Sequence, residues 1–88
     1  MIMTREQFIA TSGVAVQTLE FWIEQEWLIP DQTPGGPAFT EVEVARAHLI
    51  QDLTSDLGVN HEGVDVILHL MDQIHGLRRA LREVHDSM

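Results

Sequence analysis

The sequence predicts a small, mostly α-helical domain with two short helices near its start, a small β wing and a long C-terminal helix. Three observations predict this fold class. Apolar residues recur at helical spacing, one Pro/Gly-rich segment interrupts them, and the last apolar stripe is long and narrow. With 88 residues the chain is expected to form a single domain, in which residues 4–57 hold the first helices and the wing and residues 60–85 the final helix.

The first two helices are predicted on either side of a tight turn. Thr4 and Gln7 have the spacing of a capping box, which predicts a helix that begins after Thr4. Gly13 can adopt a positive φ and is expected to form the turn. The apolar residues that follow predict a second helix over about residues 15–25. Two helices joined in this way form a helix-turn-helix arrangement.

A loop and a third helix come next. The segment Asp31–Pro37 predicts a hairpin tip, flanked by the wing residues Leu28–Ile29 and Ala38–Phe39. Thr40 and Glu43 form a second capping box, so a helix is expected from there to Leu57, with Gly58 as its stop. The side chains expected to face the core from this helix are Val42, Ala45, Leu49, Leu53 and Leu57.

The final helix is expected to begin after the capping residue Asn60 and to reach Val84 or beyond. Its first part, Val64–Met71, is apolar over a broad arc, which predicts that it is mostly buried. Farther along, the apolar residues narrow to a heptad seam. We expect this seam to form a homodimer or to dock onto the body of the protein; its residues beyond Met71 are Ile74, Leu77, Leu81 and Val84.

The charge of the chain distinguishes between nucleic-acid and protein partners. The chain has 14 acidic residues against five arginines and no lysine, a formal net charge of −9, and residues 6–45 contain no basic residue. Because nucleic-acid binding depends on Lys and Arg, no nucleic-acid partner is expected. A negative field attracts basic proteins instead.

Acidic and apolar residues on and after the second helix are the candidate partner-binding site. A solvated acidic face is the plainer interpretation of the carboxylates, and Phe21 fits the core as well as an interface. Trp22 and Trp27 are expected in the core. The candidate binding residues are Gln17, Glu20, Phe21, Glu24, Glu26 and Asp31.

Other functions have little support in the sequence. There is no Cys, and the five His residues lack the spacing of a zinc site, so no metal or other cofactor is expected. No phosphate-binding glycine loop or activated nucleophile is evident, which argues against an enzyme. Neither a signal peptide nor a membrane-spanning stretch is apparent, so a cytoplasmic location is expected.

The residues Gly13–Leu19, Leu28-Ile29-Pro30, a glycine-containing wing and Phe39-Thr40 resemble the MerR-type winged helix-turn-helix. The resemblance implies that fold for residues 4 to about 71. MerR-type regulators usually carry Arg after the Leu of the first segment and Arg in the wing. This chain has Glu20 at the first position and an uncharged wing from Pro34 to Phe39.

The final helix resembles the chaperone-modulator (CbpM-like) family, which is similar to a MerR-type domain diverted from DNA. The resemblance lies in Gly63–Ile74 and the Arg/Leu-rich tail Leu77–Leu81. It implies a regulator that binds the J domain of a DnaJ/CbpA-like co-chaperone and blocks its work with a DnaK-type chaperone. A dimeric MerR-like transcriptional regulator and an adaptor for another partner are the alternatives.

Overall fold

The computed structural model describes residues 1–87, which divide into two compact units, Met1–Gly58 and a second unit that begins at Val59. The first unit contains α1 (Arg5–Ser12), α2 (Val16–Glu24), the strands β1 (Asp31–Thr33) and β2 (Gly36–Ala38), α3 (Glu41–Gln51) and the π-helical turn η1 (Asp52–Asp56). The second unit consists of α4 (His61–Asp86). The mostly helical fold, the small sheet and the long C-terminal helix confirm the predicted fold class. A single domain over the whole chain stays a prediction.

Helix ends are set by local sequence. At α1, the Thr4 hydroxyl accepts the N–H of Gln7 at 3.2 Å while the Gln7 side chain accepts the N–H of Thr4 at 2.8 Å, so the predicted capping box is present. Gly13 ends the helix with a φ of +75° and donates its N–H to the carbonyl of Ile9. At α4, the Asn60 side chain accepts the N–H of Gly63 at 2.8 Å, which confirms the predicted cap.

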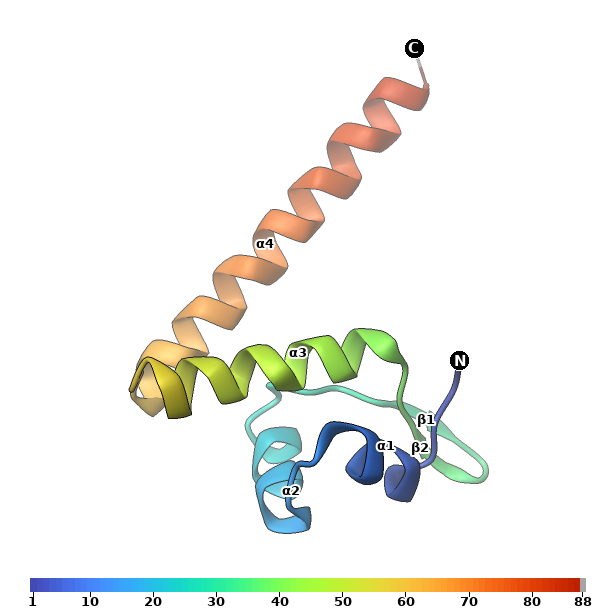
Figure 1. Ribbon diagram of the computed structural model, residues 1–88. Helices are drawn as coiled ribbons and strands as arrows, with labels where there is room; N and C mark the ends of the chain where they lie inside the picture. Colours follow the sequence, from blue (N-terminus) through green and yellow to red (C-terminus); the bar gives the residue numbers. More distant parts are fainter. Residues whose placement is uncertain (88) are drawn as a thin grey trace. The chain divides into compact units, whose positions relative to one another are not determined.

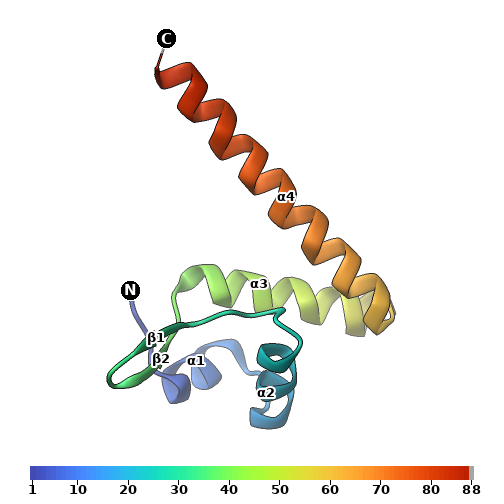
Figure 2. The same ribbon diagram turned by 180° about the vertical axis from the view of Figure 1, so that it is seen from behind.

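Within the first unit, α1 and α2 lie on the same side of α3 in both views (Figures 1 and 2). Phe8 of α1 stacks on Phe39 with ring centroids 4.5 Å apart. Both tryptophans are buried, as predicted, at 5% exposure for Trp22 and 4% for Trp27. The buried apolar residues of this unit are Met3, Phe8, Val14, Leu19, Trp22, Trp27, Leu28, Phe39, Ala47, Ile50 and Leu53.

The wing is an antiparallel hairpin shifted along the chain from the prediction. Its strands pair Asp31 with Ala38 and Thr33 with Gly36, so Leu28–Ile29 lies before the sheet. Phe39 pairs with Met3 instead: each N–H donates to the other's carbonyl, at 2.7 and 2.9 Å. The N-terminal segment is therefore held to the residue after β2 by an isolated bridge, a pairing between residues too distant in sequence for local patterns to predict.

For three residues of the third helix, the prediction that the side chain faces the core is wrong. Val42, Ala45 and Leu57 are exposed, whereas Ala47 and Ile50 are fully buried. The buried side runs through residues 47, 50 and 53, so it shares Leu53 with the predicted stripe but is turned around the helix away from the rest of it. The predicted α-helix also ends earlier, at Gln51, because the π-helical turn replaces its last turn.

The broad apolar arc of the final helix is also only partly buried. Val64 and Leu68 are buried, but Val66 is 56% and Leu70 51% exposed. Residues two apart in an α-helix point to nearly opposite sides, so burial of Val64 and Leu68 leaves Val66 and Leu70 outward. The helix itself extends to Asp86, which agrees with the predicted end at Val84 or beyond.

Candidate functional site

The outer side of α2 is the candidate site, because the opposite side of this helix is fixed in the core. Leu19 is fully buried and Trp22 nearly so, while Gln17, Glu20 and Glu24 are exposed. The three exposed residues are spaced three and four apart, which places them on one side of the helix. Gln17, Glu20 and Glu24 thus share one exposed side of α2, and their role in binding stays a prediction.

Phe21 lies on the exposed side of α2, although its position could have belonged to the core. Its side chain is 42% exposed. Its ring meets that of Trp27 edge to face, with the centroids 5.8 Å apart, and Trp27 is itself buried. The buried indole therefore holds the phenyl ring of Phe21 in place, while part of that ring stays exposed to solvent.

Glu20 forms an ion pair with Arg5 of α1. Both side chains are substantially exposed, so the pair adds little to the free energy of unfolding, but it offsets one of the carboxylate charges on α2. The two residues lie 15 positions apart, on different helices. Arg5 is thus a member of this surface that sequence reasoning missed, since no local pattern joins it to Glu20.

The remaining candidate carboxylates lie on different elements. Glu24 belongs to the last turn of α2, Glu26 to the turn after it, and Asp31 to the first position of β1; all three are exposed. Glu26 has a φ of +61°, in the left-handed region that favours glycine. The carbonyl of the next residue, Trp27, accepts the Nε–H of Arg46 at 2.5 Å, which ties this turn to α3.

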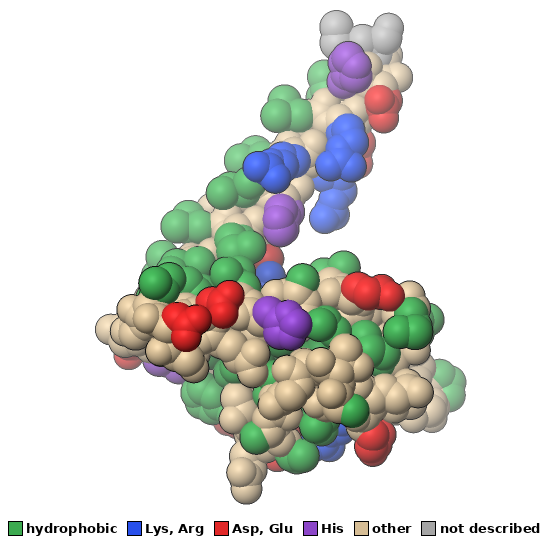
Figure 3. Space-filling model, viewed as in Figure 1, with side chains coloured by type: hydrophobic (Ala, Val, Ile, Leu, Met, Phe, Trp, Pro, Cys, Tyr) green, Lys and Arg blue, Asp and Glu red, His purple; other side chains and the backbone are tan. Residues whose placement is uncertain are grey.

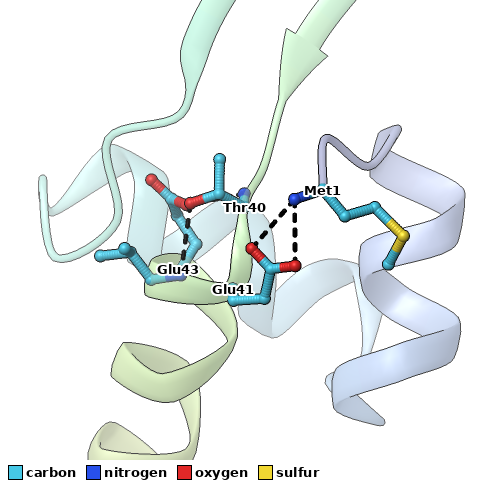
Figure 4. A network of polar contacts seen from close by, with 5 residues as sticks. Met1, Thr40, Glu41 and Glu43 are labelled. Carbon is cyan, nitrogen blue, oxygen red and sulfur yellow. Dashed lines mark hydrogen bonds and ion pairs between the residues drawn. The ribbon is translucent and has the colours of Figure 1, made fainter.

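A second polar cluster lies at the start of α3 (Figure 4). The Met1 ammonium group is 3.1 and 3.2 Å from the two carboxylate oxygens of Glu41. Beside it, Glu43 accepts the N–H and the hydroxyl of Thr40 at 2.7 and 2.6 Å, the second predicted capping box. A hydrogen bond from its own backbone, followed by the hydrogen bond and charge of Met1, lowers the pKa of the Glu41 carboxyl. These contacts stabilise the helix start and leave the surface of α2 as the candidate site.

The predicted seam of α4 is exposed beyond Met71. Hydrophobic side chains gather along one edge of this helix (Figure 3). The exposed fractions are 47% for Ile74, 65% for Leu77, 69% for Leu81 and 58% for Val84. An apolar stripe of this kind on a helix is typical of an interaction surface.

Among residues 1–87, no three His, Asp or Glu side chains are grouped so that they could hold a metal ion. Within that same part of the chain, none of the helices is both long and apolar enough to span a membrane.

The fold and the exposed second helix define a winged helix-turn-helix domain. A comparison with protein families matches residues 3–86 to the family described as MerR HTH family regulatory protein. The chain belongs to this family, and a regulatory role follows at that level. No curated protein and no solved structure matches the chain.

Proposed function

We propose that this regulator acts by binding protein: it binds the J domain of a DnaJ/CbpA-like co-chaperone and inhibits its work with a DnaK-type chaperone. The resemblance of Gly63–Ile74 to the chaperone-modulator family suggests this partner. The observation that carries the proposal is the outer side of α2. It presents the supported ring of Phe21 beside the carboxylates of Glu20 and Glu24, and α2 has no Lys or Arg.

Charge argues against DNA as the ligand of this surface. A helix that enters the major groove approaches phosphates on both sides, and Lys and Arg supply most of the affinity. Here α2 carries two carboxylates, and the wing strands carry Asp31 and no basic residue. Arg5, which reaches α2 from α1, is already paired with Glu20.

A basic helix with an apolar contact point is the ligand that suits this surface. Aromatic side chains are enriched at the centres of interfaces, and Phe21 supplies one that is held in place. Carboxylates around it attract a basic partner and speed the encounter. Since the resemblance implies that the J domain meets the DnaK-type chaperone through a basic helix, occupation of that helix explains inhibition by competition.

Titration calorimetry with a purified J domain tests this proposal. We expect binding with a Kd of about 1 μM or tighter, weakened by salt and lost or reduced at least about tenfold in Glu24→Arg. Glu24 is a better position to reverse than Glu20, whose change would also break the pair with Arg5.

Glu62→Arg is the matched control, because it changes the net charge equally at an exposed residue of α4. We expect this control to retain most of the affinity. Equal losses in the two variants would show that net charge alone drives the encounter, and no binding by the wild type would refute the proposal.

A DNA-binding dimer remains the second candidate function, because the matched family is described as helix-turn-helix regulators. A mobility-shift assay with duplex DNA at low salt separates the two. The protein-binding proposal predicts no shift, whereas a specific shift with a steep salt dependence would favour the DNA-binding candidate.

The exposed seam of α4 supports a homodimer as part of the proposal. Pairing with a second copy would remove Leu77 and Leu81 from water, and this burial stabilises a dimer by about 25 cal/mol per Å² of apolar surface. Light scattering should give about twice the 10.0 kDa mass of one chain. Leu77→Glu should return the monomer mass, and a monomeric wild type at micromolar concentration would contradict the dimer.

A further inference from the structure

The end of α3 departs from α-helical geometry over η1. The Leu57 N–H donates to the carbonyl of Asp52 at 3.0 Å, five residues back instead of four. The Thr54 hydroxyl donates to the carbonyls of Ile50 and Gln51 at 2.9 and 3.3 Å, within the same turn. Such π-helical turns are rare in proteins as a whole, and those that occur are often found at functional sites.

This turn conflicts with the apolar pattern of the sequence. Ile50, Leu53 and Leu57 are spaced three and four apart, which places them on one side of a regular α-helix. Ile50 is fully buried and Leu53 is 7% exposed, but Leu57 is 70% exposed. The extra residue in the π-helical turn rotates Leu57 by about one residue's angle away from the buried side.

We propose that the end of α3 is a register switch with two states. In the π register seen here, Leu57 is presented to solvent. In an α register, the backbone bonds run four residues back, and Leu57 turns toward the side of Ile50 and Leu53. The two states preserve nearly the same number of backbone hydrogen bonds, so the difference in free energy between them is small.

Opposing contributions hold the two states close in free energy. The α register removes the Leu57 side chain from water, which favours it. The hydrogen bonds of the Thr54 hydroxyl to two carbonyls favour the π register, because such bonds compete with the α-helical ones. Gly58, with a φ of +64°, follows directly and allows the chain to leave the helix in either state. The switch controls whether an apolar side chain is available at the end of the first unit, apart from the surface of α2.

Nuclear magnetic resonance on the full chain tests the switch. A minor state populated at about 0.1–10% gives relaxation dispersion on the μs–ms timescale, and we expect it for the amides of residues 52–58. Thr54→Ala removes the competing hydroxyl, and Ser55→Ala beside it raises the helix propensity of the turn, so this double substitution favours the α register. Deletion of Ser55 removes the extra residue and fixes Leu57 outward.

Both variants should lose the dispersion, with opposite effects on Leu57. A soluble paramagnetic agent should broaden the Leu57 methyl signals less in the double substitution and more in the deletion than in the wild type. Flat dispersion profiles in the wild type, or methyl broadening that is the same in the double substitution, would overturn the proposal. If the deletion variant does not fold, the double substitution alone still tests the proposal.

Discussion

Two neighbouring aromatic residues show how one position in a helix separates stability from recognition. Trp22 is 5% exposed and belongs to the core, whereas Phe21 is 42% exposed and rests on the edge of Trp27. A step of one residue turns a side chain about 100° around a helix, which is enough to move it from the core to the surface. The sequence alone could not place Phe21, because an isolated aromatic fits both environments.

Alanine substitutions at these two positions should therefore have different effects. Trp22→Ala leaves a large cavity and should lower the free energy of unfolding by about 3–5 kcal/mol, enough to unfold much of a domain this small. Phe21→Ala removes an exposed ring and its contact with Trp27 and should cost about 0.5–1.5 kcal/mol. Urea denaturation followed by Trp fluorescence and far-UV circular dichroism measures both, and equal losses would contradict this assignment.

Glu26 occupies a backbone conformation that favours glycine, with a φ of +61°. Glu26→Gly should raise the free energy of unfolding by about 0.5–1 kcal/mol, because the left-handed strain is removed at some cost in chain entropy. Glu26→Ala is the control, since it removes the carboxylate and retains the strained conformation. Thermal unfolding should show a gain for the glycine variant alone, and a gain of the same size in both would assign the effect to charge.

The Glu41 carboxylate gives the first unit a defined pH dependence. Because the folded-state pKa is lowered, by its backbone hydrogen bond first and then by Met1, the ionised form stabilises the fold. That contribution is complete above the usual carboxyl pKa and is lost as the pH falls through the lowered, folded-state value. The stability difference between wild type and Glu41→Gln should therefore shrink between about pH 6 and about pH 3 in denaturation experiments. A constant difference over this range would contradict the assignment.

At the scale of the elements, helix starts and stops were predictable because they depend on residues three or four positions apart. Both capping boxes, the Asn60 cap and the Gly13 turn agree with the structure, and Gly58 has a positive φ, but the α-helix before Gly58 ends earlier than predicted, at Gln51. Pairings between distant residues were not predictable, since Met3–Phe39 and Arg5–Glu20 depend on tertiary folding. The core side of α3 was also predicted wrongly. Several sides of this helix carry apolar residues, and tertiary packing decides which side is buried.

The two glycines of α4 provide a prediction for this element. A Cβ at Gly76 would meet nothing within 4 Å, so Gly76→Ala should stabilise the helix by about 1 kcal/mol. A Cβ at Gly63 would lie 2.7 Å from the Val59 side chain and 3.0 Å from the Asn60 oxygen that caps the helix. Gly63→Ala should therefore lose the expected gain and disturb the cap. Thermal unfolding of both variants measures the contrast, and an equal gain at both positions would contradict it.

At the scale of the whole molecule, an acidic chain of net charge −9 carries the fold of a helix-turn-helix regulatory family. The negative charge that makes DNA binding unfavourable is spread over the whole chain, but the proposed protein-binding surface lies on one helix. It consists of a supported aromatic ring and exposed carboxylates on the outer side of α2. The candidate residues on this helix were predictable from spacing, whereas the pairing that partly neutralises Glu20 was not.

Inhibition of a J domain by the outer side of α2 can be read from the ATPase activity of the chaperone that the J domain stimulates. The ATP hydrolysis rate of a DnaK-type chaperone is measured with its DnaJ/CbpA-like co-chaperone while the protein is titrated in. The proposal predicts that the wild type returns the rate to its unstimulated level, that Glu24→Arg does not, and that Glu62→Arg behaves like the wild type. Full stimulation in the presence of excess wild-type protein would contradict the claim.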